Sequence, residues 1–257
     1  MANSTTNTRD RVSDRLALGA LIGLLTATGA ILLLHVLPPT AAIDPIRVTV
    51  SEYGRTSLAW LFNGAVLLLA ASSVAALAAL VRRGFCRPVS VPSLLMLLWV
   101  VGLIGVAVFT KADWATGATW TGLAHRAMAV MAFVSLPIAV LIIATRRLRS
   151  RPPRRMSTPL MLAVFFTLLA IAAVVGLGVF VGIGEAVGFA WWTMIPLGLI
   201  ERTLILAELA ALAMLLLETR RPMIPLGLIE RTLILAELAA LAMLLLETRR
   251  PPRSRHP

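Results

Sequence analysis

Six uninterrupted apolar stretches alternate with short polar segments along this chain. Each has about the 20 residues that an α-helix needs to cross the hydrocarbon core of a bilayer. The stretches lack the apolar–polar alternation that marks the strands of a transmembrane barrel. The pattern therefore predicts an all-α fold, a polytopic transmembrane helical bundle. The predicted spans are 16–38, 58–81, 93–110, 122–145, 159–182 and 195–217.

The last predicted span is followed by a second copy of itself. Residues 194–222 and 223–251 are the same string, MIPLGLIERTLILAELAALAMLLLETRRP, without a mismatch. Solenoid repeats diverge and need several copies, and transporter repeats comprise several spans each. A recent in-frame duplication, or an error in assembling the sequence, explains the two copies better. We expect seven hydrophobic helices, of which six form the functional bundle and one copy is peripheral.

The predicted organisation follows from these boundaries. It comprises a disordered N-terminal tail over residues 1–14, a six-span bundle over 15–222, the duplicated span over 223–251 and a basic tail over 252–257. The N-terminal tail is rich in Ser and Thr, a composition that cannot bury enough apolar surface to order itself.

Composition agrees with a membrane protein. The chain is 59% hydrophobic and 14% charged, whereas a soluble domain is roughly half apolar and about a quarter charged. A net charge of +12 would suggest nucleic acid in a soluble chain, but here the arginines lie in short segments beside the spans. We therefore expect membrane lipids, and no nucleic acid, as partners. The single cysteine, Cys86, excludes an intrachain disulfide.

The distribution of arginine predicts an orientation. The N-terminal segment, the second loop, the fourth loop and the segment after the sixth span carry 3, 3, 6 and 2 arginines. The other loops carry only Arg47, Arg55 and Lys111. The positive-inside rule then places the N-terminus in the cytoplasm. We expect the bundle to lie in the plasma membrane. The opposite interface would hold an aromatic belt of Trp60, Trp114, Trp120, Trp191 and Trp192.

Polar side chains gather on the predicted extracytoplasmic side, above all in the loop DPIRVTVSEYG over residues 44–54. We expect this loop and the neighbouring helix ends to form a polar pocket that binds a lipid or a small amphiphile. Glu185 lies on the same side. The candidate ligand-binding residues are His35, Asp44, Arg47, Ser51, Glu52, Tyr53, Asp113, His125, Arg126, Glu201, Arg202 and Glu208.

Catalysis is an alternative use of the same residues. In a membrane-embedded hydrolase, His125 would act as the base, oriented by Asp113 or Glu52. A purely structural role is the competing interpretation, in which Asp44 pairs with Arg47 and Glu52 with Arg55. Two histidines far apart in sequence make a weak metal site, so we expect neither a metal nor a cofactor. The sequence contains no nucleotide-binding loop, serine elbow or zinc-protease helix.

Glu201 and Glu208 are seven residues apart and share one face of the last span. A carboxylate near mid-membrane is unfavourable unless it is protonated, paired or hydrated, so Glu208 should face the bundle interior. One interpretation is a proton-coupled transporter, and the other is a protonated acid that bonds across helices. The second copy repeats the pair as Glu230 and Glu237.

Two stretches resemble a known family. The first is HVLPPTAAIDPIRVTVSEYG over 35–54, and the second is FTKADWATGATWTGLAHRAMAVMAF over 109–133. The second contains a Phe-x-x-x-Asp spacing followed by Gly122 and His125. In this order they resemble the bacterial membrane family catalogued as domain of unknown function 998, over about residues 15–217. The resemblance implies a bundle of roughly six helices and no established reaction.

An assembly partner without any ligand remains a further alternative, and the oligomeric state is open.

Overall fold

The computed structural model describes residues 2–112, 119–150, 157–189 and 194–220. All regular elements in these ranges are helices, which confirms the predicted all-α class. They belong to the first of two units, Met1–Pro222. The α-helices are α1 (Ala2–Leu34), α2 (Ala59–Arg82), α3 (Val91–Val108), α4 (Trp120–Arg149), α5 (Thr158–Val187) and α6 (Leu197–Thr219), and the 3₁₀ helices are η1 (Thr40–Ala42) and η2 (Val50–Arg55).

Five described helices are long and apolar enough to cross a membrane. They coincide with the first five predicted spans. α6 is of similar length, but it carries Glu201, Arg202, Glu208 and Glu218 and is not among the five. Its role as a sixth span therefore stays a prediction, and the duplicated segment 223–251 and the basic tail 252–257 lie outside the described residues. The five candidates are Arg11–Leu34, Ala59–Arg82, Val91–Val108, Trp120–Arg149 and Thr158–Val187.

The first helix begins earlier than the sequence pattern predicts. α1 starts at Ala2 and continues through residues 2–14, which the composition predicts as a tail. The physical reason is cooperativity: once the apolar segment has formed a helix, each added residue gains one hydrogen bond without a new nucleation step. At the other end, α1 stops at Leu34, and the Pro38-Pro39 pair follows.

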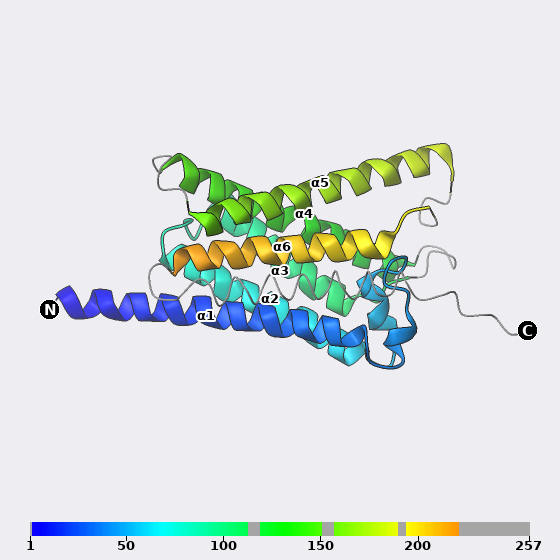
Figure 1. Ribbon diagram of the computed structural model, residues 1–257, viewed down its shortest axis with the longest axis horizontal. Helices are drawn as coiled ribbons and strands as arrows, with labels where there is room; N and C mark the ends of the chain where they lie inside the picture. The colour runs from blue at the N-terminus through cyan, green and yellow to red at the C-terminus, as the bar shows by residue number, and fades with distance from the viewer. Residues whose placement is uncertain (1, 113–118, 151–156, 190–193, 221–257) are drawn as a thin grey trace, which may run out of the picture. The chain divides into compact units, whose positions relative to one another are not determined.

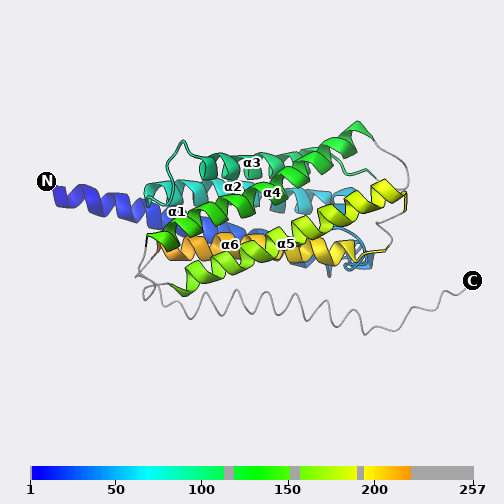
Figure 2. The same ribbon diagram turned by 90° about the horizontal axis from the view of Figure 1, so that it is seen from above.

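Consecutive helices are antiparallel neighbours within Met1–Pro222, as Figure 1 and Figure 2 show. α6 also contacts α1, α2 and α4, so it occupies a central place in this unit. It is buried along nearly its whole length. We call the side where α1, α3 and α5 end and α2, α4 and α6 begin the loop end. The opposite side is the arginine end.

Glycines set the closest helix contacts. Gly102 and Gly105 of α3 face Met128 of α4, and Gly102 also faces Ala132. A side chain at Gly102 would meet the carbonyl oxygen of Met128 at 2.7 Å. The α3 and α4 backbones therefore approach one another closely, a device common between membrane helices.

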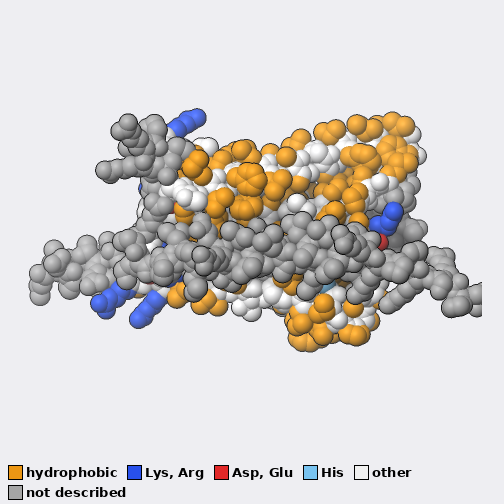
Figure 3. Space-filling model, viewed as in Figure 1, with side chains coloured by type: hydrophobic (Ala, Val, Ile, Leu, Met, Phe, Trp, Pro, Cys, Tyr) orange, Lys and Arg blue, Asp and Glu red, His pale blue; other side chains and the backbone are white. Residues whose placement is uncertain are grey.

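Large apolar side chains point outward from α1, α2, α3, α4 and α5. Phe165, Leu168, Val175 and Val179 of α5 are exposed, and α5 is the least covered of the five candidate spans. In Figure 3, hydrophobic side chains run over α5, whereas Lys and Arg side chains stand towards the two ends. This distribution is typical of helices whose outer faces meet lipid.

Candidate functional site

The loop between α1 and α2, residues 35–58, packs against the start of α6. Leu199 N donates to the carbonyl oxygen of Ile46 over 3.0 Å. Gly198 makes this approach possible, because a side chain there would overlap the carbonyl oxygens of Pro45 and Val48. Backbone contacts between the loop and α6 therefore place the polar residues of both at the loop end.

Arg202 is the centre of this contact. Its Nη1 donates to the carbonyl oxygens of Pro45 at 2.7 Å, Val48 at 2.8 Å and Gly198 at 3.0 Å. Its Nη2 donates to the Tyr53 hydroxyl at 3.1 Å. The side chain is buried, with 6% of the residue exposed. The guanidinium is thus committed to holding the loop on α6, with its donors pointing inward.

The Nε donor of Arg202 selects one form of His35. Arg202 Nε donates to His35 Nε2 over 2.9 Å, so Nε2 must be an unprotonated acceptor. His35 Nδ1 lies 2.9 Å from the carbonyl oxygen of Ile31, which can only accept. The geometry therefore assigns the proton to Nδ1 and a neutral ring. The Tyr53 ring packs edge-on against it at 5.4 Å between centroids.

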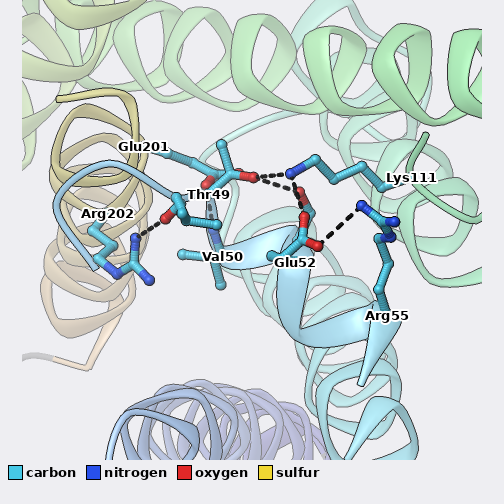
Figure 4. Close-up of polar contacts among 9 residues, drawn as sticks. Thr49, Val50, Glu52, Arg55, Lys111, Glu201 and Arg202 are labelled. Carbon is cyan, nitrogen blue, oxygen red and sulfur yellow. Dashed lines mark hydrogen bonds and ion pairs between the residues drawn. The ribbon is translucent and has the colours of Figure 1, made fainter. Parts of the chain in front are cut away.

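A second group of contacts surrounds Glu52, and we call it the Glu52 cluster: Thr49, Ser51, Glu52, Arg55 and Lys111. Lys111 Nζ donates to Glu52 Oε2 at 2.8 Å and to Thr49 Oγ1 at 2.6 Å. Arg55 Nη1 donates to Glu52 Oε1 at 3.0 Å. Two cations therefore share a single carboxylate, as Figure 4 shows.

Glu201 connects this cluster to α6. Its Oε2 accepts the backbone N–H of Val50 at 2.5 Å, at the start of η2. Figure 4 places Glu201 and Arg202 on opposite sides of the loop segment that carries Thr49 and Val50. Neighbouring residues of one helix thus fix both sides of the same loop.

His125 lies in the first turns of α4 and is buried. Its Nδ1 is 2.8 Å from the carbonyl oxygen of Phe109, whose ring packs against Trp120. If Nδ1 donates this hydrogen bond, Nε2 carries the lone pair that a base requires. Asp113, the predicted orienting acid, lies outside the described residues, and Glu52 is bonded to Arg55 and Lys111 instead.

Three further predicted site residues, Asp44, Ser51 and Arg126, also lie at the loop end. Asp44 is exposed and its carboxylate accepts the backbone N–H groups of Ile46 and Arg47, at 2.8 and 3.3 Å, so it shapes the turn. Ser51 Oγ shares a hydrogen bond with Thr49 Oγ1, which is not a base that could activate a serine nucleophile. Arg126, one residue after His125, is half-buried at the start of α4.

Glu208 stands apart from both groups. It is buried, with 1% of the residue exposed, and among the described residues neither carboxyl oxygen has a hydrogen-bond partner. One turn earlier on the same helix, Leu204 packs in an apolar cluster with Ala170 of α5 and Ala207. The structure therefore does not bring Glu208 into the polar site at the loop end.

Lys111 is the functional candidate that sequence reasoning missed. The available signal was its identity, because it is the only lysine among the 24 basic residues of the chain. Backbone partners such as the carbonyls of Pro45 and Val48 have no sequence signal. In the described residues, no group of three or more His, Cys, Asp or Glu side chains could hold a metal ion.

Comparison with known proteins gives one match. The family model described as "Protein of unknown function (DUF998)" matches residues 21–218. No curated protein and no solved structure matches the chain. The matched range includes the loop, the Glu52 cluster, His125 and all of α6 except its final residue.

Proposed function

Since the chain belongs to the DUF998 family of unknown function, and since its apolar helices mark it as a membrane protein, we propose a binding role for the loop end. The protein binds the anionic headgroup of a lipid or small amphiphile at the Glu52 cluster. On this proposal the bundle lies in the plasma membrane, with the N-terminus in the cytoplasm and the loop end outside. The pattern of arginines along the sequence supports this orientation.

The observation that carries the proposal is the pair of cations at Glu52. Lys111 and Arg55 both bond to this one carboxylate. Their side chains are 13% and 35% exposed, so the cluster is neither fully buried nor fully solvated. Lys111 Nζ has three N–H groups and uses two on Thr49 and Glu52. A phosphate or carboxylate would accept the third.

Apolar side chains flank these cations on the chain. Val108 ends α3 three residues before Lys111, and it is exposed. Trp120 at the start of α4 and Trp60 at the start of α2 are 71% and 70% exposed. Exposed tryptophan at helix ends is typical of the membrane interface, where an amphiphile has its headgroup. The helix ends near these cations in sequence thus suit a ligand with one charged and one apolar part.

We expect Lys111→Gln to weaken binding of an anionic lipid by roughly ten-fold, because about 1.4 kcal/mol of charge-assisted bonding is lost. The measurement is native mass spectrometry of the full chain in detergent, titrated with phosphatidylglycerol and, separately, phosphatidylcholine. The expected result is a preference for phosphatidylglycerol that the substitution removes. Arg55→Gln, at the more exposed cation, should reduce the preference in the same direction.

Arg149→Gln is the matched control, since it removes one exposed positive charge at the arginine end. It should leave the affinity of the loop-end site unchanged. Equal losses in Arg149→Gln and Lys111→Gln would show that general charge attraction explains the binding, and the proposal would fail. It would also fail if the wild-type chain bound both lipids equally.

A hydrolase is the second candidate, favoured by one observation, the backbone hydrogen bond that orients His125. If His125 is a general base, His125→Ala should lower turnover of a long-chain p-nitrophenyl ester by about 10²–10⁴-fold. The protein should keep its thermal unfolding midpoint within a few degrees. Equal rates in the two proteins, or no turnover by the wild type, would exclude this role for the tested ester class.

A further inference from the structure

Glu208 is the one ionisable side chain in the middle of the described α-helices. α2 has no ionisable residue before Arg82, its last residue, and α3 has none. Those of α1 lie towards its arginine end, up to Arg15. In the helices packed against α6, the ionisable residues also lie towards the ends. They are Arg9, Asp10, Arg11, Asp14 and Arg15 of α1, Arg82 of α2, His125, Arg126, Arg146, Arg147 and Arg149 of α4, and Glu185 of α5.

The surroundings of Glu208 provide no counter-charge in the described residues. The other ionisable groups of α6 are Glu201 and Arg202 at its start and Glu218 near its end. Glu201 bonds to Val50, Arg202 to the loop, and Glu218 accepts a hydrogen bond from Ser157. Each therefore has a partner, whereas both oxygens of Glu208 are buried without one among the described residues.

An ionised carboxylate in such a place is strongly unfavourable when no fixed cation among the described residues compensates for its lost hydration. A neutral carboxylic acid is tolerated far better. We propose that Glu208 is a proton-binding site inside the bundle, occupied by a proton in the state that the structure shows. This site is separate from the lipid-binding role proposed for the Glu52 cluster.

The position of Glu208 on α6 indicates where its proton exchanges. Seven residues separate it from Glu201, or about 10.5 Å along the helix axis, and the two share one face. Glu218 is ten residues away in the other direction and on a different face. Glu201 in turn touches the polar loop through Val50. Proton exchange therefore occurs towards the loop end, with Glu201 as the nearer of the two other carboxyl groups of α6.

The test is labelling of the full chain in phosphatidylcholine nanodiscs with dicyclohexylcarbodiimide. This apolar reagent enters the membrane and adds to a protonated carboxyl group, which ends as a stable N-acylurea with no group lost. Digestion at arginine yields the same peptide from 203–220 and 232–249, so wild-type labelling does not distinguish Glu208 from Glu237. The variants Glu237→Gln and Glu208→Gln give the two peptides different masses.

At pH 7 we expect residue 208 to be labelled in Glu237→Gln, while exposed carboxylates such as Asp44 are not. Raising the pH should reduce labelling of residue 208. After a jump to high pH, Glu201→Gln should slow the decline in the reactivity of residue 208 at least several-fold. Glu208→Gln should keep the wild-type unfolding midpoint, because an amide resembles the neutral acid. Its infrared spectrum should lack the band of a protonated carboxyl that Glu237→Gln retains.

Absence of labelling at residue 208 across the pH range in which the protein is folded would overturn the proposal. A large fall in the unfolding midpoint of Glu208→Gln would also overturn it, because it would indicate an ionised carboxylate with a counter-charge. Loss of lipid preference in Lys111→Gln has no bearing on these readouts. The two proposals therefore fail independently.

Discussion

Arg202→Ala is expected to lower the free energy of unfolding by about 3–5 kcal/mol. The substitution leaves His35 Nε2, the Tyr53 hydroxyl and the carbonyls of Pro45 and Val48 without their donor in a buried place. Each unsatisfied group costs roughly 1–3 kcal/mol, although relaxation and water entry recover part of the sum. The measurement is chemical unfolding in detergent, together with hydrogen exchange of residues 35–58, which should exchange faster.

The duplicated segment supplies a matched control. Arg231 has the same sequence neighbours as Arg202, so Arg231→Ala changes the same residue type in the same local context. Since the structure gives the loop contacts to Arg202, Arg231→Ala should have a much smaller effect and leave the loop protected. Equal effects of the two substitutions would contradict the assignment of these contacts to α6. Arg202→Lys should be intermediate, because an ammonium keeps the charge and loses the planar fork.

Gly102→Leu should separate α3 from α4 and destabilise the protein by about 1–3 kcal/mol or more. A Cβ at this position would lie 2.7 Å from the Met128 carbonyl oxygen and 2.9 Å from the Ala132 Cβ. These atoms belong to the α4 backbone and to an alanine side chain. Neither can move aside as a long, flexible side chain would. Thermal unfolding of the full chain in detergent measures the effect.

Gly64→Leu in α2 is the control for this prediction. Gly64 is exposed, and a side chain there meets nothing within 4 Å. It should leave the unfolding midpoint unchanged or raise it slightly, because leucine favours helix more than glycine does. If Gly102→Leu behaved like Gly64→Leu, the close approach of α3 and α4 would not exist in the membrane.

Much of the fold could be predicted from the sequence, because a membrane helix is specified by local properties. Its length, its apolar composition and the polar residues around it all lie within one short stretch of chain. The first five spans were found in this way. The sequence pattern was less informative for α6, where four ionisable residues in one helix depend on burial by other helices. It did not indicate that α1 begins at Ala2, since a polar composition does not prevent a helix from extending.

Part of the site could also be predicted. The sequence placed the first loop, His35 and the α6 pair Glu201–Arg202 at one end, and the structure brings them into contact. The pairing of Glu52 with Arg55 was considered as a structural alternative and is present. Lys111 and the loop carbonyls were missed, because a contact between residues 49 and 111 has no signal in local spacing.

The sequence by itself determined the class of this protein and which of its residues are chemically unusual. Apolar length and charge are properties of single segments, so they need no neighbour to be recognised. Only the tertiary structure decided what those residues do to one another. Arg202 is committed to the loop, Glu52 is shared by two cations, and Glu208 is left without a partner in the described residues. Each outcome depends on which helix lies beside which, and that is fixed by packing across the bundle.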